Sequence, residues 1–204
     1  MNSKNALEWH KKDDALKVAR RKILLNICKG KRILDIGGGI GKTASYLSNK
    51  GYSVTVLEKN KEFIKYGKSK NKRVKFIQGN AYNLNFNETF DEVLIEEVIE
   101  HVKDQKRMVK EARKVLKKDG RIIISTPNKW VYRAWLAIGR LVYFRWNELF
   151  LHVPGHISEI NTNELKNLLD EFKKVKIYGV NYFFDEVAKK HSSLGIGIVA
   201  VAQK

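Results

Sequence analysis

The sequence predicts an α/β fold, in which a seven-stranded, mostly parallel sheet carries helices on both faces. Strand-like apolar runs alternate with helix-like periodicity from residue 32 to residue 126, as is typical of parallel sheets. A glycine-rich turn follows the first of these runs, at 35–41. Two late strand signals, 175–183 and 195–202, are close in sequence and predict an antiparallel last strand. Because 204 residues with 43% hydrophobic content can bury one sizeable core, we expect residues 1–204 to form a single domain.

The segment before the first strand predicts helix. Apolar side chains recur through it and include Leu7, Leu16 and Leu24. We expect residues 1–28 to form a helical cover across the ligand cleft. His10 belongs to no constellation of functional residues, and we expect it at the surface.

The first strand, at 32–34, leads into the turn Asp35-Ile36-Gly37-Gly38-Gly39-Ile40-Gly41. Glycines tolerate positive φ and allow a ligand to approach the backbone, and the helix expected at 42–50 offers free N–H groups. A P-loop would need glycine at Ile36, and a dinucleotide fingerprint is matched only in a weak variant. Asp35 would repel a pyrophosphate and attract an ammonium group. The turn therefore favours a ligand that carries an amino acid.

The pattern of Asp35, Gly37, Gly39 and Gly41 resembles the first motif, D-x-G-x-G-x-G, of the class I S-adenosylmethionine-dependent methyltransferases. This resemblance implies a Rossmann-like fold and S-adenosylmethionine as the methyl donor. Glu58 follows the strand expected at 52–57. At this position the family has an acidic residue that accepts hydrogen bonds from the ribose hydroxyls. The donor pocket implied by the resemblance contains Asp35, Gly37, Gly39, Gly41, Glu58, Lys59, Asn80, Ala81 and Glu96.

Asn80 departs from the family pattern, which usually has an aspartate that receives the adenine amino group. The side-chain carbonyl of Asn80 can still accept that hydrogen bond. Further matches follow in the family's order: 90–102 resembles the fourth strand and the short helix after it, and 117–126 resembles a turn and the fifth strand.

A cluster of titratable residues follows the fourth strand. If a helix begins near Glu97, then Glu97, Glu100 and His101 share one face. They could hold a divalent cation such as magnesium, which would lower the pKa of a substrate hydroxyl. His101 could instead act as a general base, or hydrogen-bond a neighbouring loop. The Glu-x-x-Glu-His pattern also resembles the quinone O-methyltransferase branch of the family.

A second histidine, His156, resembles the family's histidine before the helix that follows the fifth strand. It could face the substrate, as a second candidate catalytic residue, or belong to a structural loop. Thr162 can cap the helix, whose expected buried face consists of Leu165, Leu168, Leu169 and Phe172. His191, like His10, is expected at the surface.

Residues 129–154 interrupt the path from the fifth strand to that helix and hold three of the four tryptophans, Trp130, Trp135 and Trp146. Arginines interrupt the segment too often for a transmembrane span. An insertion that forms an interfacial helix, a substrate lid and a helix buried against the core all remain open.

The formal net charge is +18, from 40 Lys and Arg against 22 Asp and Glu. RNA, anionic lipid headgroups and acidic small molecules are all suitable partners, and a solvated basic surface is the simpler alternative. The single cysteine, Cys28, excludes an intrachain disulfide and indicates a reducing compartment. The N-terminus lacks the apolar run of a secretory signal. We expect a cytoplasmic protein, with peripheral contact at the inner, anionic face of the membrane as an extension.

The expected function is methyl transfer from S-adenosylmethionine to a small-molecule acceptor, which a lipid or quinone-like molecule would suit. An RNA methyltransferase and a protein that binds S-adenosylmethionine without turnover are the alternatives. The sulfonium methyl group is already activated, so alignment supplies much of the rate and no catalytic residue needs to be obvious.

Overall fold

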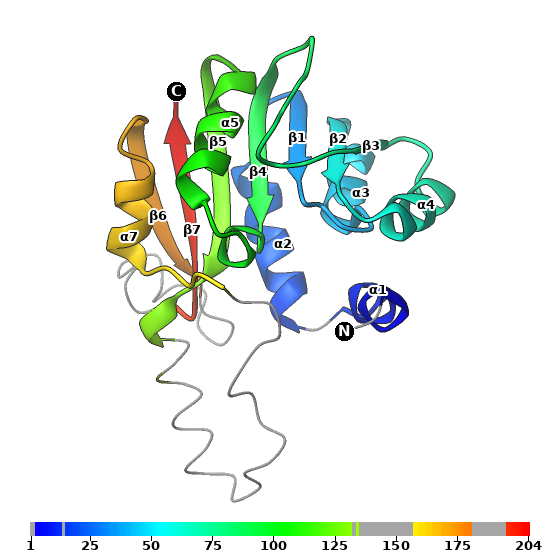
Figure 1. Cartoon of the computed structure of the whole chain (residues 1–204), viewed down its shortest axis with the longest axis horizontal. Coiled ribbons are helices and arrows are strands. Elements are labelled where there is room, and N and C mark those ends of the chain that lie inside the picture. The colour runs from blue at the N-terminus through cyan, green and yellow to red at the C-terminus, as the bar shows by residue number, and fades with distance from the viewer. Residues whose placement is uncertain (1–2, 14, 132–133, 135–156, 181–194) are drawn as a thin grey trace, which may run out of the picture.

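The computed structural model describes residues 3–13, 15–131, 134, 157–180 and 195–204. Within them a seven-stranded sheet has the order β3-β2-β1-β4-β5-β7-β6, as Figure 1 shows. The strands are β1 (Arg32–Ile36), β2 (Ser53–Glu58), β3 (Lys75–Gln78), β4 (Phe90–Glu96), β5 (Leu116–Pro127), β6 (Lys173–Val180) and β7 (Gly197–Gln203). The pairs from β3 to β5 are parallel, whereas β7 runs antiparallel to both β5 and β6. The predicted fold class is confirmed, including the antiparallel last strand.

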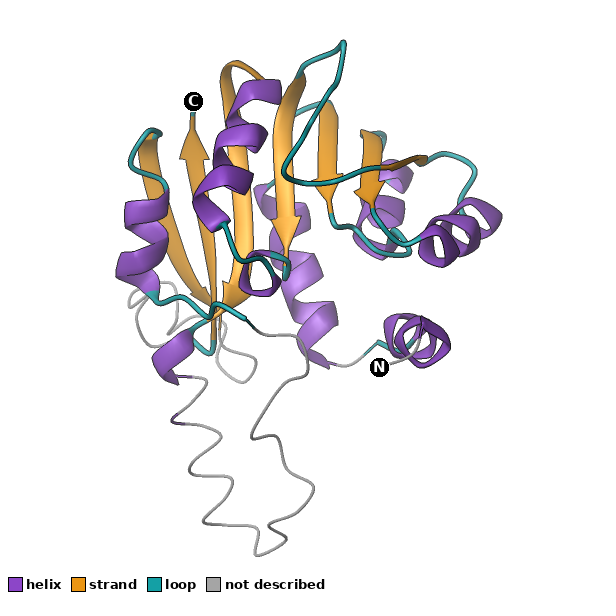
Figure 2. Ribbon diagram, viewed as in Figure 1, coloured by secondary structure: helices purple, strands orange, loops and turns teal. Residues whose placement is uncertain are grey.

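Helices cover both faces of the sheet (Figure 2). They are α1 (Ser3–Lys11), α2 (Ala15–Ile27), α3 (Lys42–Asn49), α4 (Lys61–Lys70), α5 (Gln105–Val115) and α7 (Thr162–Leu168), with the short 3-10 helix η1 (Ile99–His101). Apolar residues of α5 and α7 join one core cluster, and those of α2, α3 and α4 join the other. Because both faces are covered, central strands such as β1 are buried along nearly their whole length.

The residues before the first strand form two helices with different roles. Leu24 of α2 is fully buried in the sheet's core, and Cys28, just after α2, is buried with it. Burial raises the pKa of the Cys28 thiol, which makes it unreactive. By contrast, α1 lies beyond the carboxyl ends of β1 and β2 (Figure 1). We predicted that residues 1–28 cover the ligand cleft. Because α2 packs on the sheet, only α1 and the link between α1 and α2 lie where such a cover would be.

The helix after the fifth strand begins at Thr162, so its N-cap lies one residue earlier than the cap that we predicted. Asn161, rather than Thr162, is the N-cap, and its side chain accepts hydrogen bonds from the N–H groups of Asn163 and Glu164. The Glu164 side chain accepts in return from the N–H of Asn161, which completes a capping box. Leu165, Leu169 and Phe172 are buried and Leu168 packs against them, as predicted.

Most of the segment predicted as an insertion lies outside the described residues. Only 129–131 and 134 are described, so Trp135, Trp146 and His156 fall outside, as does His191. Within the described parts of the chain, we find no helix that is both long enough and apolar enough to span a bilayer.

Candidate functional site

The carboxyl ends of three parallel strands bring the expected donor-pocket residues together. Asp35 lies near the end of β1, while Glu58 and Glu96 are the last residues of β2 and β4. In-register pairing of β1 with both neighbours aligns these ends. In open α/β sheets ligands bind at this edge, where the strand order reverses.

The turn after β1 has a backbone that glycine adopts far more readily than other residues. The φ angles of Gly37, Gly39 and Gly41 are 72°, 56° and 75°. A Cβ atom on Gly37 would also lie only 2.6 Å from the Val98 side chain. Because these positions carry no side chain, a ligand can lie directly on the main chain of the turn.

Glu58 fixes this turn to the end of β2. Its carboxylate is 7% exposed and accepts hydrogen bonds from the N–H of Gly39 at 3.1 Å and from the N–H groups of Lys59 and Asn60 at 2.8 Å. These bonds hold the carboxylate at the floor of the expected pocket. The Lys59 side chain is exposed, so its backbone is the part of this residue that belongs to the site.

Asn80 is exposed at the end of the third strand, and Ala81 beside it is half-buried. The Asn80 side-chain oxygen accepts a hydrogen bond from the N–H of Tyr82 at 2.9 Å. This Asx-turn engages the same oxygen that we expected to receive the adenine amino group, although a carbonyl oxygen has a second lone pair for a ligand.

Asp35 carries a buried carboxyl group that the described residues do not satisfy. It is 1% exposed, and neither carboxyl oxygen has a hydrogen-bond partner among them. Burial, followed by the nearby Glu96 and Glu58, raises the pKa of Asp35 well above its usual 3.8. A cationic group bound at this edge would stabilise the ionised form of Asp35, and the ammonium and sulfonium groups of S-adenosylmethionine are such groups.

We expect Asp35→Asn to stabilise the ligand-free protein and to weaken binding of S-adenosylmethionine. With its pKa raised in the folded state, Asp35 favours folding below pH 3.8 and makes unfolding easier as the pH rises through its folded pKa. The substitution should raise the free energy of unfolding more at pH 8 than at pH 5, because an amide does not ionise and the cost of ionising the buried carboxyl is removed. Urea unfolding at pH 5 and pH 8 measures this, with the exposed Asp170→Asn as control. Equal pH dependence in parent and Asp35→Asn would contradict the prediction.

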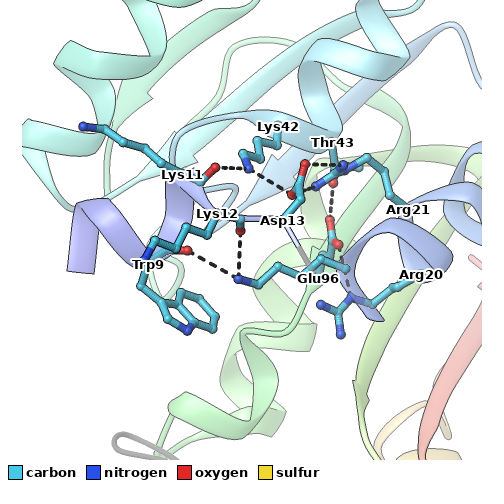
Figure 3. Close-up of polar contacts among 10 residues, drawn as sticks. Trp9, Lys11, Lys12, Asp13, Arg20, Arg21, Lys42, Thr43 and Glu96 are labelled. Carbon is cyan, nitrogen blue, oxygen red and sulfur yellow. Dashed lines mark hydrogen bonds and ion pairs between the residues drawn. The ribbon is translucent and has the colours of Figure 1, made fainter. Parts of the chain in front are cut away.

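Arg20 is a site residue that the sequence analysis missed. Its guanidinium contacts Glu96 Oε1 at 3.3 Å and Glu97 Oε2 at 2.8 Å, and its side chain is 13% exposed. Glu96 also accepts a hydrogen bond from the Thr43 hydroxyl at 2.5 Å, and Figure 3 shows Arg20, Glu96 and Thr43 in one network. No local pattern could reveal Arg20, because its partners lie more than 70 residues away in the sequence.

The local structure after β4 corrects the premise of the metal hypothesis. Glu97 has a φ of 53° and lies outside the helix, since only Ile99–His101 form a short 3-10 turn. Glu97 pairs with Arg20 and accepts a 3.3 Å hydrogen bond from the Ser125 hydroxyl, while Glu100 accepts one from Thr126 at 3.1 Å. No three His, Cys, Asp or Glu side chains among the described residues form a group that could hold a metal ion. As placed, Glu97, Glu100 and His101 do not fit a divalent-cation site.

Glu100 and His101 differ strongly in environment. The Glu100 side chain is 1% exposed, and burial, followed by Glu97, raises its pKa well above the usual value. The His101 imidazole is 40% exposed, with Nε2 4.0 Å from Glu100 Oε1. His101 is thus accessible at the carboxyl edge of the sheet, as a base acting on a bound acceptor would need to be.

His10 corrects a second expectation, because it is half-buried and packs against the glycine turn. Its ring lies 3.3 Å from the position that a Cβ atom of Gly39 would take. It packs edge-on against the Phe63 ring, with 4.6 Å between the two ring centroids. Burial, followed by the charges of Lys17 and Lys42, lowers the pKa of His10 to about 4. His10 is therefore neutral near pH 7.

An ion-pair network holds α1 in this position (Figure 3). Lys42 Nζ donates to the Lys11 carbonyl at 2.6 Å and contacts Asp13 Oδ1 at 2.9 Å, and Asp13 also pairs with Arg21 at 3.0 Å. Arg21, more than any other neighbour, lowers the pKa of Asp13 to about 2. Lys42 and Thr43, the two residues that resemble the end of a P-loop, are thus engaged with protein groups, which disfavours a phosphate site.

Comparisons with known proteins bear on the whole arrangement. A family model described as a methyltransferase domain matches residues 34–124. A probable S-adenosylmethionine-dependent methyltransferase of Mycobacterium tuberculosis is 28% identical over 143 residues, covering 70% of this chain and 48% of that protein. The ubiquinone biosynthesis O-methyltransferase of Rickettsia akari is 28% identical over 187 residues, covering 80% of this chain and 74% of the relative. This chain therefore spans about half the length of its mycobacterial relative.

A solved structure shows the same fold. The SAM-dependent methyltransferase of Thermotoga maritima, described as a possible histamine N-methyltransferase, superposes with a TM-score of 0.68 at 20% identity. The superposition covers 92% of this chain and 88% of that one.

Proposed function

We propose that this chain is a class I S-adenosylmethionine-dependent methyltransferase, which transfers the sulfonium methyl group of S-adenosylmethionine to a small-molecule acceptor. The observation that carries the proposal is the buried, unsatisfied carboxyl of Asp35 directly before the glycine turn. A pocket that holds several carboxylates against one arginine favours a ligand with net positive charge, which S-adenosylmethionine has and its demethylated product lacks.

Each donor-pocket residue has a role in this proposal. Glu58 accepts the ribose hydroxyls, while Asn80 and Ala81 border the adenine. Arg20 pairs with the carboxylate of the donor. The carboxyl groups of Glu96 and Asp35 favour the positively charged ammonium and sulfonium groups of the donor. The glycine turn and the Lys59 backbone provide the close main-chain surface.

The acceptor is proposed to be apolar, lipid or quinone-like. Two observations support this: relatives named as ubiquinone biosynthesis O-methyltransferases, and the tryptophan-rich composition of residues 129–154. A hydroxyl acceptor needs a proton acceptor as the methyl group moves, and we propose His101 for this role. His156, outside the described residues, is the second candidate. The net charge of +18 favours RNA as the alternative acceptor.

The test is incubation of the protein with isotopically labelled S-adenosylmethionine and a cell extract, followed by mass detection of labelled products. We expect a labelled small molecule. We also expect His101→Gln to reduce its formation while donor affinity, measured by calorimetry, is unchanged. Labelled RNA would support the alternative acceptor. Donor binding without any labelled product would contradict the enzymatic proposal and leave a binding protein.

A further inference from the structure

Exposed aromatic and aliphatic side chains gather where α1 meets α2. We call Trp9, Lys12, Lys17 and Val18 the elbow patch. Trp9 is 54% exposed and Val18 is 36% exposed. Lys17 Nζ lies 3.6 Å from the centroid of the Trp9 ring and donates to the carbonyls of Trp9 and Lys12. A largely exposed tryptophan ring thus has a lysine held against it.

A second exposed tryptophan with a lysine beside it follows β5, and a further exposed aliphatic residue, Ile157, precedes α7. We call Lys129, Trp130 and Ile157 the exit patch. Trp130 is 61% exposed and Ile157 is 57% exposed. Lys129 Nζ lies 5.5 Å from the centroid of the Trp130 ring and also contacts Glu164 at 3.4 Å. The Ile157 N–H donates to the Glu100 carbonyl, which ties this patch to the end of the predicted site.

The backbone segments that carry the two patches lie at the same end of the molecule. In Figure 1, α1 and the residues after β5 both extend beyond the carboxyl ends of the parallel strands, one at each side of the site. Trp9, Val18, Trp130 and Ile157 are four of the five exposed large hydrophobic side chains among the described residues. Isolated exposed hydrophobics are common, but this concentration around one edge is not expected from chance scatter.

We propose that this face docks on an anionic lipid membrane. Tryptophan and lysine side chains suit the membrane interface, where an apolar ring enters the headgroup region and a cation meets lipid phosphate. The net charge of +18 favours an anionic partner. The aliphatic Val18 and Ile157 favour lipid over RNA, since RNA offers phosphates and stackable bases but no hydrocarbon.

Docking in this orientation turns the carboxyl edge of the sheet toward the bilayer. An apolar acceptor could then reach the site without crossing water. That consequence rests on the proposed function, whereas docking itself does not.

The experiment is co-sedimentation of the full chain with vesicles of phosphatidylcholine alone or mixed with phosphatidylglycerol. We expect binding to the mixed vesicles only, and weaker binding at 0.5 M salt because exposed charges are screened. The double variant Trp9→Ser with Trp130→Ser should abolish pelleting. Lys12→Gln should weaken partitioning about fivefold, as expected for one cation near an anionic surface.

Two matched controls lie outside the two patches. In the first control, Tyr46 of α3, which is 51% exposed, is replaced by Ser. In the second, the exposed Lys118 near the start of β5 is replaced by Gln. Both should bind like the parent. Equal losses in the controls, equal binding to neutral vesicles, or RNA binding through the same tryptophans without vesicle binding would each overturn the proposal. Donor calorimetry on the same variants should give the parent affinity, so a failure of docking is distinguishable from a failure of the donor site.

Discussion

Replacement of Glu58 by alanine should weaken binding of S-adenosylmethionine by about 10- to 150-fold, which corresponds to about 1.5–3 kcal/mol for hydrogen bonds to a charged group. In our proposal the Glu58 carboxylate accepts hydrogen bonds from both ribose hydroxyls. Because Glu58 is only 7% exposed, these hydrogen bonds are stronger than hydrogen bonds at the surface. Isothermal titration calorimetry with the donor and with its demethylated product measures the loss.

The carboxylate also anchors the glycine turn through the Gly39 N–H, so two controls are needed. Glu58→Gln keeps an acceptor oxygen and the side-chain volume and should lose less affinity than Glu58→Ala. Glu62→Ala removes an exposed carboxylate from the first turn of α4 and should bind as the parent does. If Glu58→Ala binds the donor with unchanged affinity, the donor does not lie on this turn.

Gly41→Ala should destabilise the protein by about 2–5 kcal/mol. Its φ of 75° costs a residue with Cβ roughly 1–2 kcal/mol. The new Cβ would also lie 2.5 Å from Phe76 Cζ, and such overpacking costs typically about 1–3 kcal/mol. The ring has little room to retreat, since a Cβ on Gly67 would meet Phe76 at 2.5 Å as well. Urea unfolding gives the change in free energy.

Gly51→Ala separates the two contributions. Gly51 has a φ of 91°, but nothing lies within 4 Å of the place its Cβ would take. This variant should therefore lose only the backbone part. Equal losses in Gly41→Ala and Gly51→Ala would show that contact with Phe76 costs nothing and that the turn can move away from β3.

The sequence was sufficient for the fold because its signals are local. Ile33 and Leu34 are apolar at successive positions of the first strand, as is typical of a strand that is buried on both faces. The N-cap of α7 shows that local signals can place the start of a helix wrongly by one residue. Asn161 and Thr162 are both good N-cap residues, and the position of Glu164 three residues after Asn161 selects the first.

The region after β4 shows where a local pattern misleads. Spacing alone would place Glu97, Glu100 and His101 on one helical face. The positive φ of Glu97 removes it from the helix, and its carboxylate pairs instead with Arg20 from α2. A partner 77 residues earlier in the sequence leaves no trace in the spacing of the motif.

By itself the sequence determined where three acidic residues lie relative to the predicted strands. Asp35 precedes the glycine turn, Glu58 follows the second strand, and Glu96 lies at the end of the fourth. These positions follow from hydrophobic periodicity and from the backbone freedom of glycine, which act over a few residues. Only the tertiary structure placed His10 against Gly39 and Arg20 between Glu96 and Glu97. Contacts of this kind depend on how helices dock on a finished sheet, and the burial that lowers the pKa of His10 and raises that of Asp35 exists only once they have docked.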